Sequence, residues 1–432
     1  MGGSPGGRPG GLAVLAPLSA GPGQARGLPR HLHAWPPRPL RRLALVILLL
    51  ASWPLRLAAA DYSLIPLPAF DTDPNAGNTY GFLPVLLLKD KDDRITTIVA
   101  PSVTYNNFRG FTGTFRYFAY PSPGERLEVI AGYSQTIERT LDLHYRNQDL
   151  FGDRFHGDVE LLFDRDCTVR FFGLGPESEK IDETNMTLQT TGFYGIFGVN
   201  ITPQARLSLG ETVESFDVLR GCVPNLPFTG DRFPDLPGVD GAVVHAQRAS
   251  LSYDDRDSPS TPTRGLSARI FLEASARLLG SGSDYVKAGA EGAYLYPLFD
   301  ARLVLVAHGL FEALSGEENT PFEVLPRLGG AQTLRGFSPN RFFGNGRILA
   351  NLEARASVVR WRLFGADTEF QVAPFVDMGK VFQNAKQLFS DGIEVTPGIG
   401  FRGISPPNIV GHIDLGVSRE GPAIYVGLDY PF

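Results

Sequence analysis

The chain has 432 residues, of which 43% are apolar, 20% charged and 11% aromatic, with 49 Gly, 34 Pro and 2 Cys. A mean hydropathy of −0.05 excludes a bundle of membrane helices, since no apolar run after the N-terminal region reaches the roughly 20 residues that a spanning helix needs. The many glycines and prolines exclude a long coiled coil, and two cysteines exclude a disulfide-dense scaffold or a multi-cysteine metal site. The composition therefore favours many short β-strands.

The first 60 residues have the features of an export signal. Residues 1–42 are rich in Gly, Pro and Arg, contain no acidic residue and end on two arginines, and an apolar run, Leu43–Trp53, follows. Small residues at Ala58–Ala60 then offer a cleavage site before Asp61. This is the order of a secretory signal peptide. We therefore expect residues 1–60 to be a disordered leader plus a signal peptide that is removed on export.

Removing that leader changes the charge of the chain. Residues 1–60 hold seven Arg and no Lys, Asp or Glu, so the remaining chain carries 33 basic and 46 acidic side chains, a net charge of −13. An acidic chain repels phosphate backbones, and we therefore expect no nucleic-acid partner. The histidines are scattered without the spacing of metal ligands, so the sequence predicts no metal site and no cofactor.

The next segment, residues 61–79, contains three prolines and a glycine and predicts a short irregular periplasmic segment. From Tyr80 onward, apolar and polar residues alternate with the period of two that is typical of β-strands with one apolar face. Seventeen segments follow this pattern: Tyr80–Lys89, Ile95–Tyr105, Phe111–Tyr120, Leu127–Gln135, Leu141–Arg146, Gly157–Asp164, Leu188–Asn200, Gln204–Val213, Val243–Asp254, Leu266–Ala276, Tyr285–Tyr296, Ala301–Phe311, Ile348–Val359, Glu369–Lys380, Ile393–Arg402, Val410–Ser418 and Gly421–Phe432. A closed outer-membrane barrel has an even number of strands, so we expect one segment near residues 141–173 to be wrong and about 16 strands in all.

Alternating strands fit either a soluble sandwich or a transmembrane barrel. Most of the segments run about nine to fourteen residues, which exceeds typical soluble strands and matches a tilted membrane crossing. Aromatic residues gather near segment ends, as at Tyr117–Tyr120, and the last segment runs to the terminal Phe432, as closure against the first strand requires. The predicted fold is all-β: a transmembrane antiparallel β-barrel over residues 80–432, with long loops at 176–185, 220–240 and 314–346.

Four motifs, in a fixed order along the chain, carry a family resemblance. Leu328–Phe337, in the third long loop, resembles the sixth extracellular loop of the BamA/TamA family, the bacterial surface antigen superfamily of outer-membrane assembly and secretion barrels. The Asp/Arg/Pro-rich stretch Asp254–Gly265 resembles the family's short turn ahead of a strand. Phe375–Phe382 resembles its second strand after the loop. The end of the chain resembles the C-terminal signal of assembled barrels, carried by Tyr425, Gly427, Tyr430 and Phe432.

The resemblance implies that this loop folds back into the barrel lumen and docks there through an Arg-Gly-aromatic tip, which is Arg335, Gly336 and Phe337 in this chain. The alternation of the neighbouring segments turns Glu353 and Asp377 inward. Because a poorly solvated arginine needs a carboxylate partner, we predict that Arg335 pairs with Asp377, Glu353 or both. The alternative is a solvated loop tip with Asp377 merely lining the lumen.

The resemblance also implies a function. We expect a Gram-negative outer-membrane barrel that helps to insert or move polypeptide or lipid, through a weak seam between Tyr80–Lys89 and Gly421–Phe432. Full-length relatives carry periplasmic POTRA domains before the barrel, and residues 61–79 are too few to form one. The implied partners are outer-membrane lipid, the barrel assembly machinery during insertion of the chain itself, and a periplasmic accessory protein. The alternative is a passive channel or a structural barrel.

Other constellations favour structural roles. Residues 398–403 match G-x-G-x-x-G, but they lie within a strand segment and open no helix, so they do not predict a nucleotide site. His412 and Ser418 are six residues apart on one strand segment, roughly 20 Å, which is too far for a catalytic pair, and we expect no enzyme. Cys167 and Cys222 could pair in an oxidising compartment.

Overall fold

The protein is described by a computed structural model over residues 61–92, 94–363, 366–390, 392–405, 409–428 and 430. The predicted leader and signal peptide, residues 1–60, and the terminal Phe432 lie outside the described residues. No helix among the described residues is long and apolar enough to cross a bilayer. The described part of the chain contains no POTRA domain.

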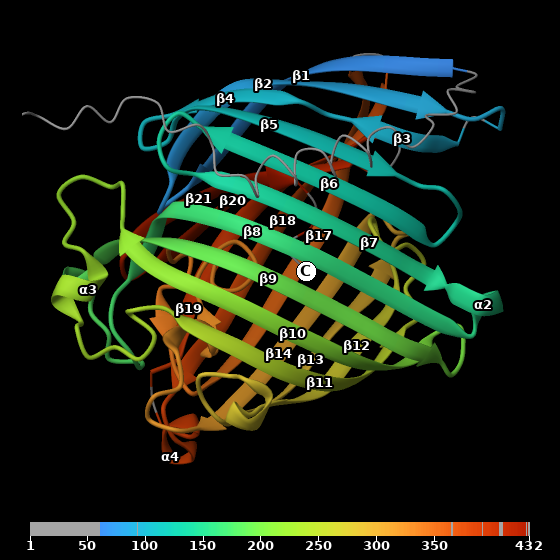
Figure 1. Cartoon of the computed structure of the whole chain (residues 1–432). Coiled ribbons are helices and arrows are strands. Elements are labelled where there is room, and N and C mark those ends of the chain that lie inside the picture. Colours follow the sequence, from blue (N-terminus) through green and yellow to red (C-terminus); the bar gives the residue numbers. More distant parts are fainter. Residues whose placement is uncertain are drawn as a thin grey trace, which may run out of the picture. The chain divides into compact units, whose positions relative to one another are not determined.

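An antiparallel β-sheet closes on itself into a barrel (Figure 1). Its strands are β1 (Asp61–Asp73), β2 (Gly77–Lys89), β3 (Ile95–Val99), β4 (Ser102–Asn106), β5 (Gly110–Ala119), β6 (Glu125–Ser134), β7 (Arg139–Asp149), β8 (Phe155–Phe171), β9 (Thr184–Asn200), β10 (Ala205–Arg220), β11 (Ala242–Asp254), β12 (Gly265–Ser275), β13 (Tyr285–Leu298), β14 (Leu303–Gly316), β17 (Gly346–Leu363), β18 (Ala366–Phe382), β19 (Glu394–Ser405), β20 (Ile409–Ser418) and β21 (Gly421–Leu428). Apart from β3 and β4, each of these strands pairs with the next one along the wall, and β1 meets β21. Because β3 and β4 lie end to end between β2 and β5, the 19 strands occupy 18 positions in the wall.

The connections contain short elements only. These are α2 (Leu150–Asp153), α3 (Thr229–Arg232), α4 (Ala385–Leu388), three 3-10 turns at Lys180–Asp182, Arg277–Leu279 and Phe322–Val324, and a two-stranded sheet of β15 (Arg327–Leu328) and β16 (Phe342–Phe343). The long connections β8–β9, β10–β11 and β14–β17 all leave one end of the barrel, hereafter the long-loop end (Figure 1). The opposite end, where the chain enters β1, is the short-turn end.

The predicted all-β antiparallel barrel is confirmed, but its strand count is 18 instead of about 16. All seventeen predicted segments contain wall strands, including β7 and β8, where we expected an error. The missing strand is β1, which pairs with β2 from Asp61–Lys89 to Asp73–Gly77 in the segment predicted to be irregular. Proline rarely occurs in a central strand but is tolerated in an edge strand, and β1 is an edge strand because it lies at the seam.

Alternate side chains point out of and into the barrel. On β12, Leu272 is 55% exposed, whereas its neighbour Glu273 is 5% exposed. Large apolar side chains are exposed on the outer face of most wall strands. A surface of this kind is stable against hydrocarbon, with the polar side chains enclosed.

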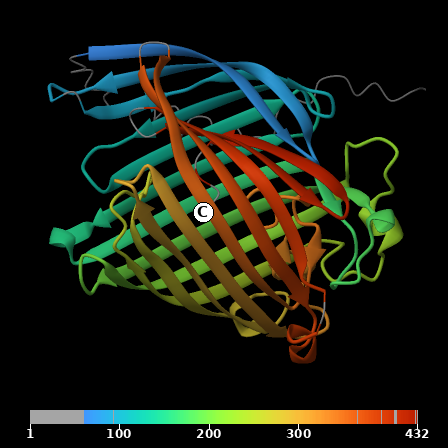
Figure 2. The same ribbon diagram turned by 180° about the vertical axis from the view of Figure 1, so that it is seen from behind.

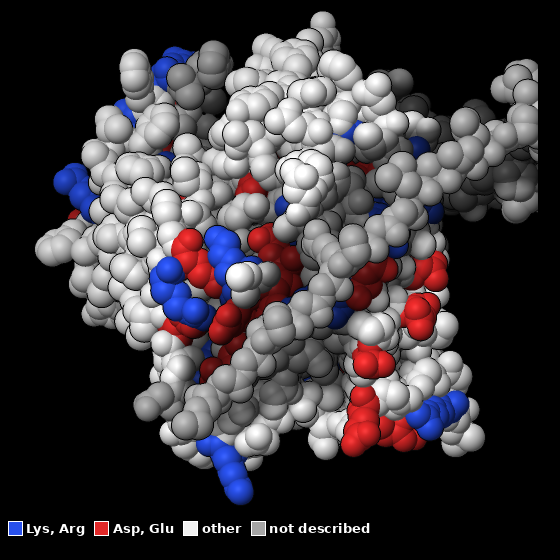
Figure 3. All heavy atoms as spheres, turned by 90° about the vertical axis from the view of Figure 1, so that its left-hand side faces the viewer, with Lys and Arg blue, Asp and Glu red and all other residues white. Residues whose placement is uncertain are grey.

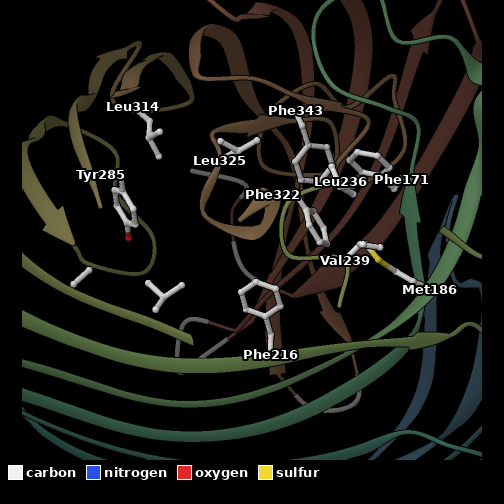
Figure 4. Packing of buried hydrophobic residues seen from close by; sticks show 12 residues of the cluster. Phe171, Met186, Phe216, Leu236, Val239, Tyr285, Leu314, Phe322, Leu325 and Phe343 are labelled. Carbon is white, nitrogen blue, oxygen red and sulfur yellow. The ribbon is translucent and has the colours of Figure 1, made fainter. Parts of the chain in front are cut away.

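At the long-loop end, the loops share an apolar core of their own. Phe171, Phe216, Phe322 and Phe343 lie close together there, with Met186 beside them (Figure 4). A disulfide between Cys167 and Cys222 ties the end of β8 to the loop that follows β10. The loops therefore form a packed cover over this end of the lumen.

Candidate functional site

The β14–β17 connection, residues 317–345, carries Arg335 into the lumen, where this side chain is completely buried. Its Nε donates to Asp377 Oδ2 at 3.0 Å and its Nη2 to Asp377 Oδ1 at 2.8 Å, which makes the pair bidentate. Its Nη1 donates to Glu353 Oε2 at 2.6 Å, and its backbone N–H donates to Asp377 Oδ2 at 3.0 Å. The structure thus places Arg335 against both carboxylates that the strand alternation turned inward.

The two carboxylates come from adjacent strands. Glu353 lies on β17 and Asp377 on β18, with exposures of 3% and 0%. Asn351, directly opposite Asp377 in the ladder, donates to Asp377 Oδ1 at 2.8 Å and to the Thr333 carbonyl at 2.7 Å. This amide fixes the carboxylate and the loop backbone relative to each other.

Further charges surround this pair. Arg355 Nε lies 2.8 Å from Glu353 Oε1, and Arg402 Nη1 lies 2.8 Å from Asp414 Oδ1. Three arginines therefore face three carboxylates, and the buried cluster is neutral overall. A buried charge is tolerated only when opposite charge compensates it. We call Arg335, Arg355, Arg402, Glu353, Asp377 and Asp414 the lumen ion cluster.

The sequence did not predict the roles of Arg402 and Asp414. The alternation of side chains could have shown that both residues point inward. Arg402 follows Phe401 on β19 and Asp414 follows Ile413 on β20, and Phe401 and Ile413 face outward, each nearly half exposed. The strand register that brings them beside Arg335 is not visible in the sequence.

Glycines allow the loop backbone to touch the wall. A Cβ at Gly416 on β20 would lie 2.3 Å from the Arg335 carbonyl oxygen. A Cβ at Gly336 would lie 2.6 Å from Thr396 Cγ2 and 2.9 Å from the Val417 carbonyl carbon. All three contacts are closer than a real Cβ approaches other heavy atoms, so the docking itself requires glycine at both positions.

Aromatic rings complete the docked tip. The Arg335 guanidinium lies 3.4 Å from the centre of the Phe375 ring, a cation–π geometry. Phe337 is 1% exposed and packs against Phe342 in an apolar cluster with Leu334. The tip residues Arg335, Gly336 and Phe337 therefore contact the lumen wall through charge, backbone and apolar surface respectively.

Comparison with known proteins identifies the family. An Omp85 superfamily domain matches residues 123–409, which is more than half of the chain. The chain belongs to the Omp85 superfamily. It is an outer-membrane β-barrel. No curated protein sequence matches it.

Solved structures resemble this Omp85 barrel at low sequence identity. BamA from Haemophilus ducreyi lacking POTRA domains 1–3 aligns over 85% of this chain and 75% of its own, with 15% identity and a TM-score of 0.53. CdiB from Escherichia coli aligns over 86% of this chain and 63% of its own, with 11% identity and a TM-score of 0.49. The first of these likenesses supports the barrel fold.

In this Omp85 barrel the seam between β1 and β21 is weakly paired. Thr72–Val426 is the single backbone pair between the two strands among the described residues, whereas the β1–β2 ladder extends along all of β1. The seam predicted from the sequence lay beside Tyr80–Lys89. That placement was wrong because β1 precedes this segment in the wall.

The docked loop contacts both sides of the seam. On the β21 side, the Tyr425 hydroxyl donates to the Phe337 carbonyl. On the β1 side, Asn75 Nδ2 donates to the Pro339 carbonyl at 3.1 Å. Arg341 Nε donates to Glu420 Oε1, in the turn before β21, at 2.8 Å. One short stretch of loop thus bridges two strands that share a single backbone pair in the described part of the chain.

The residues of the predicted C-terminal signal have separate surroundings. Tyr425 is buried at the loop, and Gly427 lies opposite His412 in the ladder. Strand β21 ends at Leu428, and the ring of Tyr430 lies 3.9 Å from the Arg355 guanidinium, with its hydroxyl bonded to Gln371. Tyr430 lies beyond the end of the strand, and the arginine attracts its ring.

The other constellations lie within the wall. The glycine motif at residues 398–403 belongs to β19, and Ser418 bonds within its own turn to Gly421 and Glu420. Among the described residues, no group of three His, Cys, Asp or Glu side chains has metal-binding geometry.

An acidic hollow opens at the long-loop end, where Figure 3 shows Asp and Glu side chains gathered. A cavity of about 360 Å³ near the loops is lined by four carboxylates, Asp164, Asp166, Glu214 and Glu323, and by Arg327.

Proposed function

We propose that this Omp85 barrel inserts or moves polypeptide or lipid by opening laterally between β1 and β21, while the docked loop holds the lumen. The weak pairing of the seam supports the proposal: among the described residues, one backbone pair joins β1 to β21, at Thr72–Val426. Separating strands that share so few hydrogen bonds costs far less than opening a full ladder. The proposed setting is the Gram-negative outer membrane, after signal-peptide removal and insertion by the barrel assembly machinery, with a periplasmic accessory protein delivering substrate.

A disulfide across the seam tests this proposal. Directly paired strand residues have Cα atoms close enough for a disulfide, and the described residues contain no free cysteine to interfere. Thr72→Cys with Val426→Cys should abolish insertion or transport by the full chain in proteoliposomes, and reductant should restore it. The matched control is Ile413→Cys with Val426→Cys, which crosslinks β20 to β21 inside the intact wall. Full activity of the oxidised seam variant would exclude a lateral opening.

The acidic hollow favours a second candidate, a passive channel for cations. The carboxylates around the cavity near Glu323 would attract cations and repel anions. Single-channel recording in planar bilayers separates the two: a channel conducts steadily, whereas a barrel closed by its docked loop conducts rarely. Steady, cation-selective conductance that survives oxidation of the seam variant would favour the channel.

A further inference from the structure

Within the described part of the chain, the edge of β1 that faces β21 has no strand partner over most of its length. From the Thr72–Val426 pair toward the short-turn end, no further pair joins β1 to β21 among the described residues. Strand β21 ends at Leu428, and Tyr430 then packs on Arg355 inside the lumen, away from β1. Figure 2 shows β1 diverging from the last strands toward its N-terminal end. A free edge therefore borders the membrane on one side and the lumen on the other.

This free edge is poor in hydrogen-bond donors. Pro66 lies opposite Pro84 in the β1–β2 ladder, and because neither has an N–H, the two form a non-hydrogen-bonded pair. The backbone groups of such a residue point to the other edge of its strand, which for β1 is the seam. Pro68, two residues along, has the same orientation. Two successive donor positions on the free edge are therefore empty.

Both faces of this part of the wall are apolar. On the outer face, Leu64 is 62% and Phe70 47% exposed. On the inner face, Val85 and Leu87 are buried in a cluster that includes Ile65, Leu67, Leu83, Ile95, Ile98 and Ala100. Other parts of the inner face are polar, as on β7, where Asp142 and His144 alternate with Leu141, Leu143 and Tyr145. The apolar surface thus continues around the edge of β1 from the membrane side into the lumen.

We propose that this edge binds the acyl chain of a membrane lipid, and that lipid is the substrate that passes the seam. The proposal rests on the lateral opening proposed above and names its substrate class. A polypeptide strand that adds to an edge needs a row of main-chain donors and acceptors, which Pro66 and Pro68 interrupt. An acyl chain needs neither, and it gains from contact with apolar side chains on both faces. The apolar cluster around Leu67 is continuous with the lipid-facing surface, so the acyl chain can pass from the membrane to the lumen along apolar side chains.

Spin labelling tests the binding surface. A nitroxide on Leu67→Cys, which faces inward, should show the high oxygen accessibility of a lipid-facing label on Leu64→Cys in proteoliposomes of the full chain. A label on Asp142→Cys, on the polar inner face, should instead be accessible to a water-soluble nickel complex. A Leu67 label that behaves like the Asp142 label would overturn the proposal. This measurement does not depend on transport, so it separates failure of the lipid site from failure of the lateral opening.

Lipid movement tests the substrate class. In proteoliposomes containing a fluorescent phospholipid, dithionite bleaching should show faster exchange between leaflets with the protein than without it. Leu67→Asp should lower that rate about tenfold or more, because a carboxylate interrupts the apolar path. Thr112→Asp, on the inner face of β5, should leave it unchanged, and heat-modifiable gel mobility confirms that both variants fold. If the protein inserts an unfolded outer-membrane protein but does not exchange lipid, the lipid proposal is overturned and the lateral opening is retained. If it moves neither lipid nor protein, both proposals are overturned.

Discussion

Replacing Arg335 by alanine should destabilise the barrel far more than replacing an exposed arginine. The substitution removes three side-chain hydrogen bonds to Asp377 and Glu353 and leaves the lumen ion cluster with one uncompensated negative charge. All of these groups are at most 3% exposed, so bulk water does not screen them. Removing one partner of a buried ion pair costs about 3–5 kcal/mol. The unfolding equilibrium constant should therefore rise about a hundredfold or more.

The assay compares Arg335→Ala with Arg360→Ala in urea unfolding and in the temperature at which the folded gel band disappears. Arg360 also pairs with a carboxylate on β18, Glu369, at 2.8 Å, but its side chain is 79% exposed. Such pairs contribute about 0–1 kcal/mol. A loss for Arg335→Ala no larger than that for Arg360→Ala would refute the reasoning. Charge exchange, Arg335→Asp with Asp377→Arg, should restore part of what each single reversal loses.

Three further predictions follow from contacts of the loop and of one turn. Gly416→Ala should loosen the docked loop and raise its protease sensitivity, because its Cβ would overlap the loop backbone, whereas Gly411→Ala on the same strand meets no atom within 4 Å and should be silent. Tyr425→Phe removes the hydroxyl that holds the loop from β21, and should raise the rate at which a thiol reagent reaches the seam cysteines; an unchanged rate would separate loop from seam. In the β11–β12 turn, burial opposes the charge of Asp257, but hydrogen bonds from Thr263 and the next backbone N–H outweigh it and hold its pKa below the ordinary value. The turn should be fully protected above the unfolded-state pKa near 3.9 and lose amide protection as pH falls below it, and Asp257→Asn should remove this pH dependence.

The strands of the barrel could be predicted because each one repeats a period of two between membrane and lumen. Strand β1 escaped prediction because Pro66 and Pro68 mark a central strand as improbable, and the sequence does not show that this strand lies at a seam. The alternation of side chains along a strand correctly placed Glu353 and Asp377 inside the barrel, since this alternation depends only on neighbours along the chain. The position of Asp414 beside Arg402 depends on the register between strands, which the alternation along one strand does not determine.

The order of residues in the lumen ion cluster has a consequence for biogenesis. Arg335 precedes its three carboxylate partners in the chain, which lie on strands β17, β18 and β20. Burying Arg335 before these carboxylates are in place would leave its charge uncompensated, so the loop tip cannot dock until β20 has joined the wall. Docking of the tip therefore depends on β20, and an assembly intermediate that lacks β20 would leave this loop exposed to water and accessible to proteases.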